Sequence, residues 1–286
     1  MGHGEWVLEV ERPVRAARRN GAKSDALDAV RAAREALSRK HLAQPRQRGD
    51  REALRVLLLT RRKTIRARTR EINQLKALVV CSREELRHQL RNLSTSKLVE
   101  RCASMRTSDR QPAEQRATVI ALRMTARRIL SLTAEADELR EEIAALVKTN
   151  VPELLEETGV GPISAAQLFC SWSHPKRVRS ESAFAMLAGS APIPASSGQT
   201  IRHRLNQSGD RNLNCALHTI VLSRLHTDPE TRAYAERRLA EGKTMREIKR
   251  CLKRYLARRL YRILETTGPG LTIQRPPRTR TLGICH

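Results

Sequence analysis

The sequence predicts a mainly α-helical protein, and three observations lead to this expectation. Residues 50–80 and 112–148 carry apolar side chains in the spacing of two long helices. Helical patterns return in the last third of the chain, at 210–226, 229–241 and 243–265. Strand-like sequence is limited to residues 5–10 and to irregular pieces within 189–209.

Composition indicates a nucleic-acid partner. The 286 residues include 55 Lys and Arg against 30 Asp and Glu, and nucleic acid is the commonest polyanion that such a chain binds. Aromatic residues make up only 2%, which argues against a base-stacking platform for single strands. The six cysteines lie far apart without a C-x-x-C pair, as in reduced cytosolic thiols. The apolar runs are too short to span a membrane, so we expect a cytoplasmic protein.

The first part of the chain is expected to be a fragment of an α/β domain. A strand at 5–10 precedes a basic loop at 11–22 and a helix at 24–40. One strand cannot form a sheet, so this fragment needs strands that the sequence does not supply.

Heptads in the next part predict helices that pack along their length. Leu58, Ile65, Ile72 and Val79 recur every seven residues. Leu54 and Leu75 occupy the second apolar position of the heptad, which Arg61 and Arg68 interrupt. With a helical connector to 112–148, this pattern predicts an antiparallel hairpin or an intermolecular coiled coil. The alternative interpretation is that both helices belong to an internal helix bundle. Residues 50–80 contain nine basic and three acidic residues, so this helix could face nucleic acid. Residues 112–150 contain six of each, as in a packing or dimerisation helix.

A C-terminal domain is expected to begin near Pro152. Gly159-Val160-Gly161 lies between two short helical stretches, which is typical of a helix-hairpin-helix element and equally of an ordinary turn. The helix at 243–265 holds nine basic and two acidic residues, and a tail from Thr266 is expected to be disordered. Its predicted apolar stripe consists of Ile248, Leu252, Tyr255, Leu256 and Ile263.

Asp25 and Asp28 form the first candidate site. They lie three residues apart, on one face of the helix at 24–40, and two carboxylates there could bind one Mg²⁺. The alternative is a helix N-terminus, with Asp25 as the cap and Asp28 favoured by the helix dipole.

A serine loop is the second candidate site. Ser196-Ser197-Gly198 could expose a hydroxyl to a phosphodiester, with arginines nearby to stabilise the developing charge. The alternative is a plain turn, for which Ser-Ser-Gly is common. His203 and Asp210 near a serine also raise the possibility of a hydrolase triad, but the nucleophile-elbow pattern is absent.

These segments together resemble the insertion-sequence 110 family of transposases, which includes the Piv-type DNA invertases. The resemblance covers roughly residues 5–265. It rests on Arg12-Pro13, Gly21 to Ala29 with Lys23-Ser24-Asp25-Ala26-Leu27-Asp28, Pro152 to Leu155, Gly159 to Pro162, Phe184 to Gly189, Ser196-Ser197-Gly198 and His203 to Leu213.

The resemblance implies three parts. A RuvC-like domain binds Mg²⁺ through four carboxylates, Asp-Glu-Asp-Asp, of which Asp25 and Asp28 match the third and fourth. A coiled coil leads to a transposase domain whose serine nucleophile matches Ser197, with Ser196 the less favoured choice. Family members act as multimers, and an RNA from the element guides some of them.

The first two carboxylates of that set should precede the Lys-Ser-Asp motif by more than 24 residues. Glu5, Glu9 and Glu11 belong to a later strand and do not replace them. We therefore expect an N-terminally shortened, impaired transposase. Its expected parts are a partial RuvC-like domain at 1–48, a coiled-coil region at 49–150, a transposase domain at 151–265 and a disordered tail at 266–286.

The function expected from the sequence is DNA transposition through Ser197, with Mg²⁺ on Asp25 and Asp28. The expected partners are DNA of the element ends and target, an element-encoded guide RNA and a second copy of the chain through the coiled coil. The alternatives are a non-catalytic nucleic-acid-binding relic and a metal-dependent junction nuclease. The residues expected to contact nucleic acid are Arg202, Arg204, Arg211, Lys249, Arg250, Lys253 and Arg254.

Overall fold

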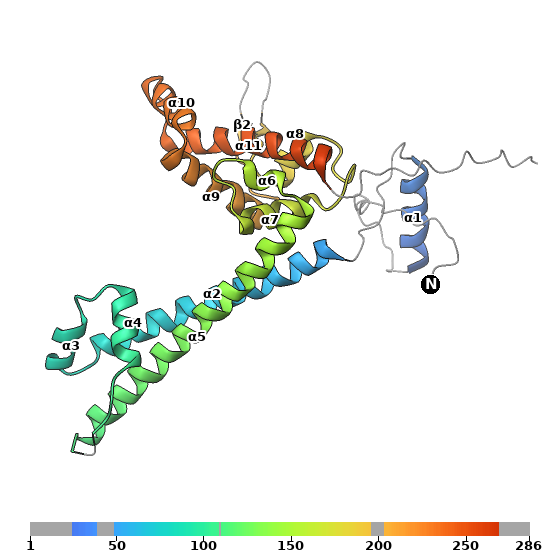
Figure 1. The fold of residues 1–286 in the computed structure, drawn as a ribbon. Helices are drawn as coiled ribbons and strands as arrows, with labels where there is room; N and C mark the ends of the chain where they lie inside the picture. The colour runs from blue at the N-terminus through green and yellow to red at the C-terminus, as the bar shows by residue number, and fades with distance from the viewer. Residues whose placement is uncertain (1–24, 39–48, 109, 196–202, 269–286) are drawn as a thin grey trace, which may run out of the picture.

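The computed structural model describes residues 25–38, 49–108, 110–195 and 203–268. These residues are mainly α-helical, as predicted, with two short strands. A long two-helix hairpin carries a group of shorter helices at one end (Figure 1). The strand expected at 5–10 lies outside the described residues, as does most of the expected disordered tail.

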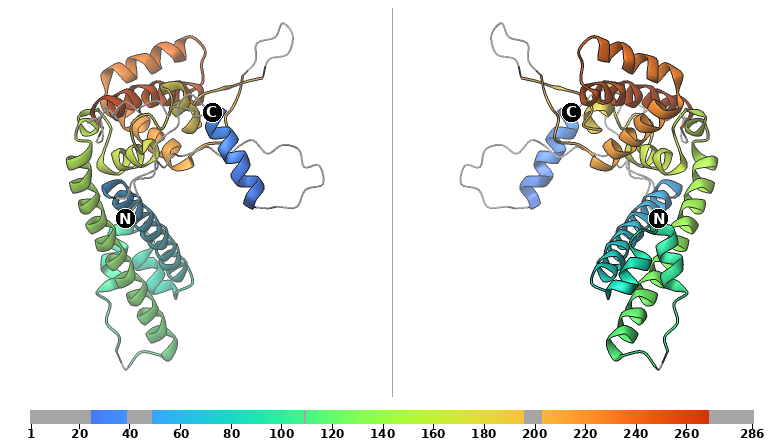
Figure 2. Two further views of the ribbon diagram at one scale, coloured as in Figure 1. Left: turned by 90° about the vertical axis from the view of Figure 1, so that its right-hand side faces the viewer. Right: turned by 90° about the vertical axis from the view of Figure 1, so that its left-hand side faces the viewer.

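The hairpin consists of α2 (Asp50–Val80) and α5 (Ala113–Asn150), which lie side by side in the views of Figure 1 and Figure 2. The bounds of α2 are those predicted, and those of α5 differ by one or two residues. Leu54, Leu58, Leu75 and Val79 are buried on α2, so the predicted seam holds at its two ends.

The middle of this seam is polar. Thr64 is buried and donates a hydrogen bond from Oγ1 to Glu135 Oε1 at 2.6 Å. Arg61 donates from Nε to the Ala136 carbonyl oxygen at 3.3 Å. Burial, followed by the nearby charges of Arg140 and Arg68, lowers the pKa of the Arg61 guanidinium. The interruption seen in the heptads is therefore a hydrogen-bonded contact between the two helices.

Two short helices, α3 (Glu84–Leu90) and α4 (Thr95–Ala103), connect the far ends of α2 and α5. They cover a separate apolar cluster at the tip of the hairpin. This cluster is formed by Leu75, Val79, Leu90, Leu98, Val99, Cys102, Leu122, Ala126 and Ile129. Burial raises the pKa of the Cys102 thiol to about 11.

Six helices and one strand pair form the C-terminal helical unit. Prolines at the first turns of α7 and α10 favour helix initiation there. The Thr244 hydroxyl and Glu247 form a capping box at the start of α11. The elements are α6 (Glu153–Glu156), α7 (Pro162–Trp172), α8 (Glu181–Leu187), β1 (Ile193–Pro194), β2 (His203–Arg204), α9 (Arg211–Thr227), α10 (Pro229–Ala240) and α11 (Met245–Thr267).

One hydrophobic core joins the C-terminal helical unit to the near end of the hairpin. Leu54 and Leu58 of α2 and Ile143 and Val147 of α5 belong to the same cluster as Trp172. Burial of each Leu, Ile or Val side chain contributes about 1.5–3 kcal/mol. The hairpin is thus anchored in the unit that follows it.

The apolar stripe of α11 differs from the prediction at one position. Tyr255 is 56% exposed, whereas Leu260, Tyr261 and Leu264 are buried. The Tyr255 ring instead meets the ring of Tyr234 on α10 edge-on, with 6.2 Å between centroids. The helix also continues to Thr267, beyond the predicted start of the tail.

The remaining helix, α1 (Asp25–Ser38), matches the helix predicted at 24–40 and contributes no residue to either core cluster. Among the described helices, none has both the length and the apolar character needed to cross a bilayer.

Candidate functional site

The segment that carries the serine loop is attached to the last turn of α8. Helix ends leave carbonyl groups without intrahelical partners, and here the two arms of the segment satisfy four successive ones. The bonds run from Ser190 Oγ to Ala185 O (3.0 Å), Asn206 Nδ2 to Met186 O (3.1 Å), Asp210 N to Leu187 O (2.7 Å) and Asn214 Nδ2 to Ala188 O (2.6 Å). Together they close a stem between residues 185 and 214.

Two glycines allow the arms of this stem to approach each other. Gly189 has φ +62° and Gly209 has φ +107°, backbone angles that residues other than glycine rarely adopt. A Cβ on Gly209 would lie 2.5 Å from the Leu187 carbonyl oxygen. A Cβ on Gly189 would lie 2.9 Å from the Ser208 carbonyl oxygen. The close backbone contact at the stem therefore requires glycine at both positions.

Above the stem, β1 and β2 pair antiparallel, with Ile193 opposite Arg204 and Pro194 opposite His203. The two strands extend away from the helices (Figure 2). The predicted nucleophile Ser197, its neighbour Ser196 and Arg202 belong to the sequence between these strands and lie outside the described residues.

A pocket of about 370 Å³ lies at the base of the stem. Its walls come from α2, α7, the last residue of α8, the start of α9 and the segments that precede α8 and α9. Four of its lining side chains are arginines: Arg51, Arg55, Arg62 and Arg177. Leu187, Asp210 and Asn212 of the stem also line it, so the pocket and the serine segment share a wall.

Asp210 has a structural role in this pocket. Its Oδ1 accepts hydrogen bonds from the backbone N–H groups of Asn212 (2.8 Å) and Leu213 (3.2 Å), which caps α9. Its Oδ2 accepts a bond from the Ser171 hydroxyl at 2.7 Å. The hydrolase triad that includes Asp210 gains no support from this arrangement, because the carboxylate serves the helix cap. Burial raises the pKa of the Cys170 thiol to about 11, so this lining thiol is protonated at neutral pH.

The predicted basic residues of α11 form two groups. Lys249 and Lys253 are partly buried toward α9, and Lys253 Nζ donates to Asn214 Oδ1 at 3.0 Å. This bond connects α11 to the stem. Arg250 and Arg254 are exposed and accessible to a partner in solvent.

His218 of α9 lies beside the two lysines. Its burial lowers its pKa, and the charges of Lys253 and Lys249 add to the effect. This imidazole is therefore neutral at pH 7. Arg204 on β2 and Arg211 at the start of α9 are exposed.

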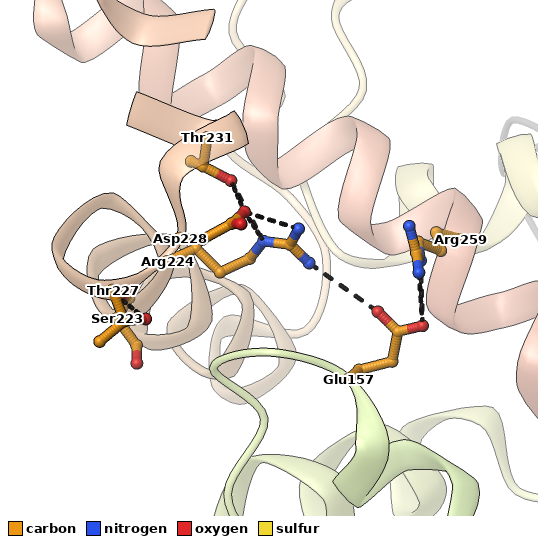
Figure 3. Close-up of polar contacts among 7 residues, drawn as sticks. All are labelled: Glu157, Ser223, Arg224, Thr227, Asp228, Thr231 and Arg259. Carbon is orange, nitrogen blue, oxygen red and sulfur yellow. Dashed lines mark hydrogen bonds and ion pairs between the residues drawn. The ribbon is translucent and has the colours of Figure 1, made fainter. Parts of the chain in front are cut away.

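The Gly159-Val160-Gly161 turn is held by a charged cluster, drawn in Figure 3. Arg224 of α9 contacts Asp228 at 2.8 Å and Glu157 at 3.8 Å, and all three side chains are at most 14% exposed. Exposed Arg259 of α11 contacts the other oxygen of Glu157 at 2.9 Å. Gly159, with φ +81°, lies against α9, where a Cβ would be 3.1 Å from the Ile220 carbonyl oxygen. The turn is thus flanked by helices α6 and α7, as predicted, and packed against α9.

Asp25 and Asp28 lie in the first turn of α1, and both are acidic groups favoured there by the helix dipole. Asp28 is exposed and forms an ion pair with Arg31 at 3.5 Å. Within the described parts of the chain, no group of three or more His, Cys, Asp or Glu side chains is placed to hold a metal ion. The arrangement therefore fits a helix N-terminus. It also places two carboxylates on one helical turn, and Mg²⁺ is commonly bound by one or two protein carboxylates.

The sequence did not reveal the arginine pocket. Arg51, Arg55 and Arg62 recur at helical spacing within the basic helix, which was the available signal. Their convergence with Arg177 depends on contacts between α2 and α7, more than one hundred residues apart, such as Arg62 Nη2 to Gln167 Oε1 at 3.1 Å.

Residues 152–236 match the model of the Transposase IS116/IS110/IS902 family. The match begins just before α6, ends within α10, and includes the stem and the serine segment. It supports a transposase function and agrees with the resemblance found in the sequence. A search of curated proteins gives no match.

Proposed function

We propose that this chain is a transposase that exchanges DNA strands through attack of Ser197 on a phosphodiester. The observation that supports the proposal most is the stem, in which four successive carbonyls at the end of α8 hold both arms of the serine segment. A nucleophile on a hairpin can attack a phosphodiester in line only if the hairpin is rigidly attached to the rest of the protein. The stem also lies within the region that matches the transposase family.

In the proposed reaction, the Ser197 Oγ attacks phosphorus and the bond from phosphorus to one DNA ester oxygen breaks. The serine proton leaves to solvent, and the departing DNA oxygen gains a proton. The product is a phosphoserine ester that conserves the energy of the phosphodiester. A hydroxyl of the second DNA strand then attacks this ester, which restores Ser197 and joins the strands. Arginines near the serine stabilise the extra charge on the phosphoryl oxygens.

Asp25 and Asp28 would hold Mg²⁺ in this proposal. Two carboxylates on the first turn of α1 fit an ion that takes oxygen ligands and keeps several waters. When bound, Mg²⁺ would neutralise charge on the phosphoryl oxygens. We expect Asp25→Asn with Asp28→Asn to abolish Mg²⁺-dependent strand exchange, whereas Glu35→Gln on the same helix leaves it intact.

DNA binding would use the exposed basic side chains of the C-terminal helical unit. Arg250 and Arg254 on α11 and Arg204 and Arg211 near the stem are exposed, as phosphate contacts require. Apolar side chains exposed along α5, Ile120, Met124 and Leu130, support association of two copies through the hairpin.

Strand exchange between two DNA sites tests the proposal. The purified chain is supplied with Mg²⁺, the DNA ends of the element and RNA transcribed from it. We expect a low yield of joined products from this impaired chain, and these products should require Ser197, so that Ser197→Ala removes them and Ser196→Ala retains them. Products that persist in Ser197→Ala and disappear in Ser196→Ala would show that the wrong serine was chosen. Steeply salt-dependent DNA binding without any product would favour the non-catalytic alternative.

A further inference from the structure

The arginine pocket at the base of the stem has an imbalance of charge. Arg51, Arg55, Arg62 and Arg177 line it, whereas Asp210 is the one acidic side chain among the lining residues. Glu52 lies beside it and pairs with Arg55 at 2.6 Å and with Arg51 at 3.5 Å. Four guanidinium groups thus face two carboxylates, one of which is already bonded to the α9 N-terminus and to Ser171.

Arg62 and Arg51 have N–H donors that meet no negatively charged acceptor in the pocket. Arg62 donates to the side-chain oxygen of Gln167, a neutral acceptor. Arg51 is 13% exposed, and its Nη2 donates a hydrogen bond to the Cys170 carbonyl oxygen at 3.1 Å, while its Nε is buried without an acceptor among the described residues. A buried donor of this kind is uncommon, because each unpaired group costs about 1–3 kcal/mol. An anion is the ligand that these two groups would accept.

Size and position identify the anion. The volume of about 370 Å³ falls within the range of ligand pockets and admits a phosphate with its flanking sugars. Planar guanidinium groups match phosphate oxygens in pairs. Leu187 and Asp210 belong both to this pocket and to the stem, so a phosphate here would lie next to the segment that carries Ser197.

We propose that this pocket binds a backbone phosphodiester of the DNA strand, through Arg62 and Arg51, and so fixes the strand beside the serine segment. This inference rests on the proposed function, because it assumes that DNA is the partner. Part of the hairpin thereby becomes a DNA-binding element, since Arg51, Arg55 and Arg62 all lie on α2.

Salt-dependent binding of duplex DNA by the full chain tests this inference. Each phosphate contact contributes about 0.9 to the slope of log affinity against log salt. We expect Arg62→Gln to lower the slope by about that amount, so that a fourfold rise in salt weakens DNA binding by the variant about 3.5-fold less than binding by the wild type. Arg62→Lys keeps the charge and should keep the slope. The control is Arg101→Gln on α4, an exposed arginine at the far end of the hairpin, which should leave the slope unchanged.

The dinucleotide d(TpT) probes the pocket without a duplex. We expect it to shift the Nε–H resonance of Arg51 in the wild type and not in Arg62→Gln, with r(UpU) binding no more tightly. Tighter binding of r(UpU) would overturn the assignment to DNA. Equal salt slopes for Arg62→Gln and Arg101→Gln, or no shift with d(TpT), would overturn the pocket itself. A wild type that binds no duplex but does bind d(TpT) would contradict the proposed function and leave the phosphate pocket supported.

Discussion

Gly209 offers a quantitative test of the stem. In Gly209→Ala the new methyl group would lie 2.5 Å from the Leu187 carbonyl oxygen and 3.0 Å from the Gly189 nitrogen. The left-handed backbone at φ +107° costs an alanine about 1–2 kcal/mol. Relief of the overlap adds about 1–3 kcal/mol, because both neighbours are backbone atoms held by hydrogen bonds. We expect a loss of roughly 3 kcal/mol in the free energy of unfolding.

Gly242→Ala is the matched control. Gly242 has φ +81°, yet a Cβ added there would meet no atom of the described residues within 4 Å, so only the backbone cost of about 1–2 kcal/mol applies. Urea unfolding followed by circular dichroism measures both variants. With a slope of about 3 kcal/mol per molar urea, Gly209→Ala should lower the midpoint by about 1 M and Gly242→Ala by roughly half of that or less. Equal shifts in the two variants would refute the close approach at the stem.

Two further predictions concern charged groups. Arg224→Met should destabilise the chain by about 3 kcal/mol in urea unfolding, because it leaves the buried Asp228 carboxylate without its ion-pair partner. Arg259→Met removes an exposed partner of the same Glu157 and should cost less than about 1 kcal/mol; similar losses would contradict the cluster in Figure 3. His218 should titrate below 6.5 in an NMR pH series, with Lys253→Met raising its pKa. Since the unfolded state then binds the proton more readily, stability should fall as the pH drops through 6.5 toward the folded-state pKa, and a His218 pKa at or above 6.5 would exclude this.

The long helices were predictable because their periodicity is local information. Heptads over α2 gave both its bounds and the buried ends of its seam, Leu54, Leu58, Leu75 and Val79. The short helices α3, α4 and α8 lack enough turns to show a period, so contacts with other elements define them. Tyr255 illustrates a related limit, since its spacing on α11 places it near the apolar face while its contact with Tyr234 depends on the position of α10.

The candidate site was only partly accessible from sequence. Gly-rich and Ser-rich composition located the loop region of 189–209, and motif order pointed to the family that residues 152–236 match. The stem was not predicted, because its bonds join the end of α8 to residues up to 26 positions later. The roles of Ser197 and of Asp25 with Asp28 stay predictions.

Trapping of a covalent intermediate tests the central claim most directly. A nicked suicide substrate releases a short fragment after cleavage, so the phosphoserine ester cannot be reversed and accumulates. Mass spectrometry of the digested adduct should then find DNA attached through phosphate to Ser197, with Ser197→Ala giving none. Cleavage of the substrate without any protein–DNA adduct would contradict the serine mechanism and indicate a metal-dependent nuclease instead.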